Sequence, residues 1–122
     1  MRMWMVPPEL MCRRHLLGEH NELHMLAGSL MRGRHLDGFL AKRLLEPSAL
    51  RERHEALAAE MTARGYRHAS PLPEFETALS HYPDALRIAL AVAAVNPDQS
   101  RRELASRCPD CARRLAEEPS ES

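Results

Sequence analysis

The 122-residue sequence has little of what sheets, membrane spans and disulfide frameworks require. It holds only two Phe, two Tyr and one Trp, and β-branched residues are few, whereas helix-favouring Ala, Leu, Arg, Glu and Met are plentiful. No apolar run approaches the ~18 residues of a membrane span, and the first residues show no signal-peptide pattern. Three cysteines, an odd number, fit a reducing compartment. We therefore expect a cytoplasmic protein with no membrane contact.

Charge of one sign is also lacking, because 17 basic and 17 acidic residues give a formal net charge of zero. This excludes a polybasic tail and argues against a general nucleic-acid binder. The two halves differ, however. Residues 1–45 carry seven basic and four acidic groups, a net +3, and residues 46–122 carry ten and thirteen, a net −3. Lys42 is the only lysine, so side-chain amines for imine chemistry are almost absent.

Hydrophobic periodicity predicts an all-α fold, a compact single-domain bundle of three to four helices over residues 1–116 with a polar tail over 117–122. The helix expected at 83–95 is apolar nearly all round, which is typical of a central, buried helix. The predicted helices cover 12–31, 48–64, 83–95 and 98–106, with a possible resumption after residue 109.

Local signals place the ends of these helices. Ser48 is a plausible N-cap of the second helix, and Gly65 a natural stop. Gly33 and Gly38 predict a loop after the first helix. Trp4 is expected to pack in the core, with a base-stacking wedge as the alternative, and most methionines are expected to fill the core as well.

The first predicted helix holds the densest chemical segment. His15, Glu19 and Glu22 fall within about 60° of one another on a helical wheel, along one edge of the apolar stripe. Carboxylates at such an edge are partly desolvated, which raises their pKa toward the range useful for proton transfer.

His20 and His24 lie one turn apart on another side of this helix. A His-x-x-x-His pair on a helix can bind zinc, but the metalloprotease motif needs Glu directly after the first His, and Asn21 stands there. Polar surface residues and a nucleic-acid-facing surface are the other interpretations. We predict no metal and no cofactor for the chemistry of this segment.

Cys108 and Cys111 form a lone Cys-x-x-Cys pair. A four-ligand zinc site would need two more ligands, and Cys12 or His68 could serve only if the fold brings them close. Pro109 would place Cys108 at a helix N-terminus, where thiolates are favoured. Structural thiols, a metal site and a redox role remain open.

Several residues at fixed spacing carry a resemblance to the pyrimidine-dimer DNA glycosylase family, also called endonuclease V, of phages and bacteria. Arg2, His15-Leu16, Glu19 and Glu22-Leu23 stand at the family's spacing without a gap. Leu50-Arg51-x-Arg53 followed by Arg64-Gly65-Tyr66 is similar to its L-R-x-R…R-G-F pattern, and His81-Tyr82-Pro83 fits more loosely.

The resemblance implies an all-α enzyme whose N-terminal α-amine attacks C1′ of a damaged nucleotide, forms an imine and nicks the strand by β-elimination. Met1 falls on the nucleophilic position and Glu22 on that of the assisting glutamate. The large Arg2 predicts that Met1 is retained. A free α-amine, with a pKa of about 7.7–8.0, is a better nucleophile near neutral pH than lysine. Arg2, His15, Glu19 and Asn21 would position the substrate.

The partner implied is double-stranded DNA with a damaged or modified base, bound by a monomer. The family's arginines beside the glutamate are replaced here by Asn21 and Met25. Phosphate contacts are therefore expected from other residues: Arg13, Arg14, His20, His24, Arg32, Arg34 and Lys42. The alternatives are a non-catalytic helical module that binds nucleic acid or protein, and a small metal-binding protein.

Overall fold

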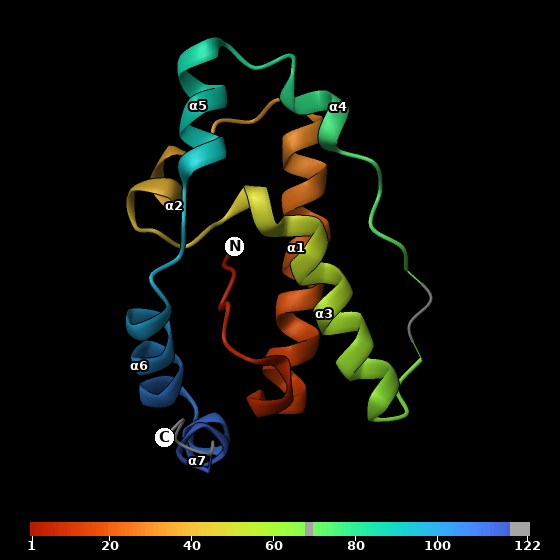
Figure 1. The fold of residues 1–122 in the computed structure, drawn as a ribbon, viewed down its shortest axis with the longest axis vertical. Helices are drawn as coiled ribbons and strands as arrows, with labels where there is room; N and C mark the ends of the chain where they lie inside the picture. Colours follow the sequence, from red (N-terminus) through yellow and green to blue (C-terminus); the bar gives the residue numbers. More distant parts are fainter. Residues whose placement is uncertain (68–69, 118–122) are drawn as a thin grey trace.

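The computed structural model describes residues 1–67 and 70–117, and in these ranges every regular element is helical (Figure 1). This confirms the all-α, single-domain prediction, although the described residues form seven α-helices, several of them short, rather than the three to four expected. Residues 118–122 of the predicted tail lie outside the described residues. No helix in the described ranges is both long and apolar enough to cross a membrane. The elements are η1 (Pro8–Leu10), α1 (Arg13–Met31), α2 (Asp37–Ala41), η2 (Pro47–Ala49), α3 (Leu50–Ala63), α4 (Glu76–Leu79), α5 (Asp84–Val92), α6 (Pro97–Arg107) and α7 (Pro109–Ala116).

Helix α1 is the axis of the fold, and α3 packs along it (Figure 1). Cys12 caps α1 by accepting a hydrogen bond from the His15 N–H, and the chain leaves the helix through Gly33, whose φ is +68°. The expected apolar stripes are buried, since burying them supplies most of the helices' stability. They comprise Leu16, Leu23, Leu26, Ala27 and Leu30 on α1 and Leu50, Leu57, Ala58 and Met61 on α3.

The first residues form a segment without regular structure that runs between α1 and α6 (Figure 1). Helices α6 and α7 pack on each other, and α7 also contacts η1 close to the start of α1. Helices α4 and α5 lie at the other end of α1, and α4 packs against it (Figure 1). The N-terminus therefore lies beside the middle of α1.

Two predicted boundaries need correction. Gly38 lies inside the short helix α2 rather than in a loop, because Leu36, Phe39 and Leu40 turn this segment onto the core. Ser48 does not cap a helix: Pro47 starts the η2 turn, and Ala49 precedes α3 without a side-chain cap. The stop at Gly65 is confirmed by its φ of +84°.

The prediction of a central, buried helix over 83–95 is wrong. Helix α5 buries only Leu90, whereas Ile88 and Val92 are 59% and 72% exposed. Asp84 and Arg87 are the only polar residues of this helix, so its composition alone could not show that it packs at the end of the bundle.

Some of the methionines are buried and others are exposed. Met3 and Met11 are fully buried, but Met25 and Met31 on α1 are 60% and 50% exposed, so the expectation of core filling is wrong for these two. Trp4, at 6% exposure, packs in the core as expected. Helix α7 confirms the predicted resumption after residue 109.

Candidate active site at the N-terminus

The N-terminal segment is held on three sides. The Met3 N–H donates to the Leu44 carbonyl over 2.8 Å, and Nη1 of Arg53 donates to the Val6 carbonyl over 2.7 Å. The Ser100 hydroxyl donates to the Trp4 carbonyl. These bonds come from the loop before α3, from α3 itself and from α6, so they fix the chain end against α1.

Glu22, on the middle of α1, faces this chain end. The Arg2 N–H donates to its Oε2 over 3.1 Å. Burial raises the pKa of the Glu22 carboxyl above its ordinary value, while the charge of the Met1 amine and the Arg2 N–H act in the opposite direction. The sequence predicted both the pairing of this glutamate with the chain end and the direction of its pKa shift.

The Arg2 side chain points away from Glu22. Its guanidinium forms an ion pair with Glu103 of α6, 2.5 Å between Nη1 and Oε2, and lies 3.8 Å from the centre of the Trp4 ring. Only 11% of the side chain is exposed. Arg2 thus joins the chain end to α6.

An open cleft of about 570 Å³ begins at Arg2. Its charged lining consists of Arg2, Lys42, Arg43, Glu103 and Arg107. Four cations against one carboxylate make this surface attractive to polyanions. Of these residues, the sequence analysis placed only Arg2 and Lys42 in the site. Arg43 could have been predicted from its position next to Lys42 in the sequence. Glu103 and Arg107 could not, because only the packing of α6 brings them to the cleft.

Glu19 has a different setting from Glu22. Its two oxygens accept from Nε and Nη2 of Arg53 over 2.6 and 2.8 Å, and the carboxylate is 1% exposed. The same guanidinium holds the Val6 carbonyl. Glu19 therefore reaches the chain end only through Arg53, a partner that the sequence analysis did not assign.

His20 and His24 join a buried third histidine, His54 of α3. The His24 and His54 Nε2 atoms are 3.2 Å apart, and the His20 ring centre is 4.8 and 4.9 Å from those of His54 and His24. His20 is only 6% exposed, so the structure does not offer it to a phosphate. The ring nitrogens are close enough together to share a metal ion.

His15 lies toward the start of α1. Its Nδ1 is 3.2 Å from the Cys12 sulfur, and its ring meets that of Trp4 edge-on with 6.0 Å between centres. Burial, followed by the charge of Arg14, lowers the pKa of His15. The sulfurs of Cys108 and Cys111 lie within 4.8 Å of the Cys12 sulfur and a His15 ring nitrogen. His68, the other ligand considered for these cysteines, lies outside the described residues.

The remaining predicted DNA contacts do not gather in one patch. Arg13 and Arg14 begin α1, and Arg32 and Arg34 follow its end, roughly 28 Å away for a 19-residue helix. All four are exposed, as is Asn21, and Arg13 also lies 5.1 Å from the Tyr66 ring centre. Only Lys42 of the predicted set lines the cleft beside the N-terminus.

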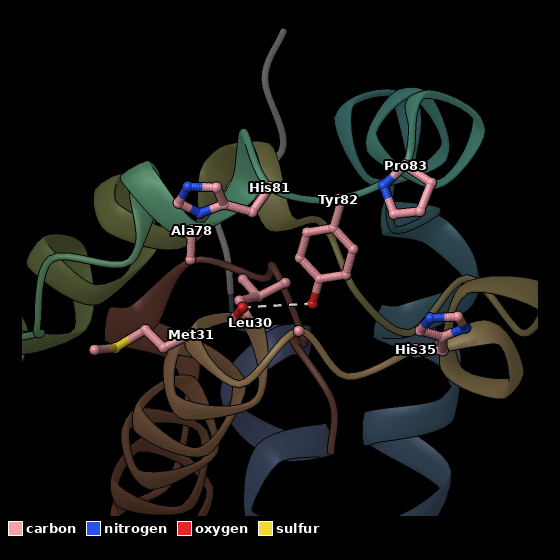
Figure 2. Close-up of a pocket in the computed structure, with 8 residues that line it drawn as sticks. Leu30, Met31, His35, Ala78, His81, Tyr82 and Pro83 are labelled. Atoms are coloured by element: carbon pink, nitrogen blue, oxygen red, sulfur yellow. Dashed lines mark hydrogen bonds between the residues drawn. The ribbon is translucent and has the colours of Figure 1, made fainter.

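A second, smaller cavity of about 130 Å³ lies at the far end of α1 (Figure 2). His35, His81 and Tyr82 line it, and the Tyr82 hydroxyl donates to the Arg34 carbonyl over 2.8 Å. It holds no carboxylate, so it lacks the paired acid and amine of the N-terminal site.

Comparison with known proteins identifies a family for this chain. The family model for pyrimidine dimer DNA glycosylase matches residues 1–74, which is more than half of the chain. The match includes Met1, Glu22 and Lys42 but not α6 or α7. No curated protein and no solved structure matches the chain significantly. The chain belongs to the pyrimidine dimer DNA glycosylase family.

Proposed function

We propose that this protein is a DNA glycosylase with AP-lyase activity, which uses the Met1 α-amine as nucleophile and Glu22 as acid–base catalyst. One observation carries the proposal: beside the terminal amine, the Arg2 backbone is bonded to the half-buried Glu22, and the Arg2 side chain lines a basic cleft. The family match supports a damaged pyrimidine in duplex DNA as the substrate.

The chemistry follows from an amine beside a carboxyl group. The neutral amine attacks C1′, the glycosidic bond breaks, and the base leaves with the bonding electrons and a proton. The sugar ring opens to give a protonated imine between C1′ and the Met1 nitrogen. Removal of a C2′ proton then expels the 3′ phosphate by β-elimination. Glu22 can accept a proton from the attacking amine and stabilise the cationic sugar.

The residues around the chain end act as positioning residues in this proposal. The Arg2 backbone N–H donates to Glu22, and the Arg2 guanidinium stacks on the Trp4 ring and pairs with Glu103. Glu19 orients Arg53, which holds the Val6 carbonyl. His15 contacts the Trp4 ring edge-on. Misplacing the amine by about 1 Å through any of these contacts is expected to slow attack about 10²-fold.

The cleft is the proposed binding site for the DNA backbone. Lys42, Arg43 and Arg107 are exposed there, whereas the Arg2 guanidinium is already bound to Glu103. Duplex DNA hides its bases, so the damaged nucleotide must leave the stack to reach the amine. The basic wall offers phosphate contacts that would hold the strand while this happens.

Borohydride trapping tests the nucleophile directly. Untagged protein with native Met1 is incubated with duplex DNA carrying a cyclobutane pyrimidine dimer or an abasic site, and sodium borohydride reduces any imine to a stable adduct. We expect an adduct whose mass maps to the Met1 nitrogen. An adduct on Lys42, or DNA binding without any adduct, contradicts the proposal, and the latter leaves a non-catalytic binding module.

The chain offers a matched control, because Lys42 supplies the only other primary amine. Lys42→Arg keeps the positive charge but cannot form an imine, so the adduct should still form. Acetylating the N-terminus should abolish trapping. Glu22→Gln should greatly slow it while the circular-dichroism spectrum stays helical.

A further inference from the structure

Four potential metal ligands from the two ends of the chain meet beside the start of α1. Cys12 caps α1 and Cys108 caps α7, and each has its partner three residues later. Their ligand atoms all lie within 4.8 Å of one another. The two pairs are 96 residues apart in sequence, so only the fold brings them together. The second pair lies outside the part matched by the glycosylase family.

The spacing fits a tetrahedral ion rather than a disulfide. The Cys12 and Cys108 sulfurs are 3.8 Å apart, and all three cysteines are free. A disulfide would require about 2.05 Å. Thiolates bound to zinc at about 2.3 Å in a tetrahedron lie about 3.8 Å from each other. His15 Nδ1 lies 3.2 Å from the Cys12 sulfur, and a ring nitrogen of His15 lies within 4.8 Å of the other two sulfurs, close enough to serve as the fourth ligand.

The backbone around the cluster favours thiolates. Each sulfur accepts an N–H: Cys12 from His15, Cys108 from Cys111, and Cys111 from Cys12, at 3.3–3.4 Å. Two helix N-termini point their positive ends at the cluster. Against this, burial raises the pKa of Cys111 to about 12. Three buried thiolates would repel one another without a cation between them.

We propose a closed structural zinc site, with one ion held by four residues: Cys12, His15, Cys108 and Cys111. Three thiolates and one imidazole form a ligand set typical of structural zinc, which is tetrahedral and keeps no open position. All three cysteines are at most 5% exposed, so the ion is shielded from substrate. Zinc here has no step in the glycosylase chemistry.

The site would clamp the α6–α7 pair to the start of α1. Helix α6 carries Glu103, which binds Arg2, and Arg107, which lines the cleft. His15 also contacts Trp4, whose ring carries the Arg2 guanidinium. Closing a loop of about a hundred residues removes much conformational freedom from the unfolded chain. The zinc therefore stabilises the wall on which the N-terminal site depends.

Metal content of the full, untagged chain tests this without DNA, so the result is independent of the glycosylase proposal. Protein is produced with added Zn²⁺ and passed through a desalting column. Inductively coupled plasma mass spectrometry should then find about one zinc per chain. Removing it with a strong chelator should lower the melting temperature by roughly 10 °C or more, and added Zn²⁺ should restore it.

Co²⁺ substitution of the unmutated chain avoids variants that fail to fold. We expect the absorption bands of a tetrahedral cobalt site together with the charge-transfer band of bound thiolates. The variants Cys108→Ser and Cys111→Ser should lose zinc, whereas His54→Gln, which alters the separate histidine cluster, should keep it. A wild-type chain that stays free of zinc after refolding with excess Zn²⁺ overturns the proposal. So does full zinc retention in both cysteine variants.

Discussion

Glu19 and Glu22 lie three residues apart on α1, yet their surroundings differ in the way that separates a structural carboxylate from a reactive one. Glu19 is 1% exposed and held by two hydrogen bonds from Arg53. Glu22 is half-buried and accepts the backbone N–H of Arg2, beside the terminal amine. One carboxylate is saturated by a guanidinium, whereas the other keeps acceptor capacity for a substrate.

Helix α1 thus carries two carboxyl groups in different environments. Complete pairing of Glu19 fixes α1, α3 and the N-terminal segment together through Arg53 and the Val6 carbonyl. Incomplete pairing of Glu22 costs stability, since burial disfavours its charge, but it leaves a carboxyl group with a raised pKa beside an amine. We expect substitutions at the two positions to act on different measurements.

Glu22→Gln is expected to have the largest effect, a fall of about 10²–10⁴-fold in the rate of base excision. Stability should not fall, because glutamine removes a carboxylate whose ionisation burial disfavours. Single-turnover cleavage of dimer-containing duplex and thermal melting measure the two quantities. A loss of melting temperature with normal cleavage would reverse the roles assigned to the two glutamates.

Glu19→Gln should lower the free energy of unfolding by about 3–5 kcal/mol, because it leaves the Arg53 charge buried without its partner. Urea denaturation measures this loss. The double variant Glu19→Leu/Arg53→Met removes both charges and should recover much of the stability. Its activity should stay below that of the parent, because without Arg53 the Val6 carbonyl loses its donor; full activity in the double variant argues against positioning through Arg53.

The pH dependence of excision should report Glu22. Attack needs the neutral amine and the Glu22 carboxylate, so protonation of Glu22 should steepen the fall in rate by about a further tenfold per unit as pH drops below its pKa. Since burial raises that pKa, the acidic limb should lie above 4.5, the ordinary value for glutamate. Single-turnover rates between pH 4 and 8 locate the limb. A limb unchanged in Glu22→Gln would assign it to another group.

Charge in the cleft should affect binding more modestly. Lys42→Gln and Arg43→Gln should each weaken DNA binding and reduce the slope of log affinity against log salt by about 0.9, one phosphate contact each. Arg87→Gln is the matched control, because Arg87 pairs with Asp84 on α5 away from the cleft. Fluorescence anisotropy at several salt concentrations measures the slopes. Equal slopes in all three variants would remove the cleft from the interface.

Glu76→Gln should have the smallest effect. Hydrogen bonding to Arg51 lowers the pKa of Glu76 to about 2, so the ion pair adds stability above pH 4.5 and loses it as pH falls toward 2. Both side chains are more than 40% exposed, and solvent screens them. The variant should therefore melt slightly earlier at pH 7 and together with the parent near pH 2. A large fall in melting temperature at pH 7 would show that this pair stabilises the fold as strongly as the Glu19–Arg53 pair.

Regular periodicity explains what could be predicted about the fold. The buried faces of α1 and α3 follow the 3.6-residue spacing of Leu16, Leu23, Leu50 and Leu57, and Gly65 ends α3 as expected. The position of α5 could not be predicted, because a helix that is apolar except for Asp84 and Arg87 does not show which side packs. The exposure of Met25 and Met31 depends on the neighbours available to α1 rather than on residue type.

The sequence by itself determined the helical class and the family, because these depend on local periodicity and on residues at fixed spacing; the pairing of the chain end with Glu22 was implied by the family resemblance. Only the tertiary structure decided that Arg53 neutralises Glu19, that Arg107 and Glu103 complete the basic cleft, and that His15 lies against Cys12. It also decided that the Cys108–Cys111 pair meets them 96 residues away. Periodicity shows which face of a helix is buried, whereas the partner of that face is chosen by the packing of the whole chain.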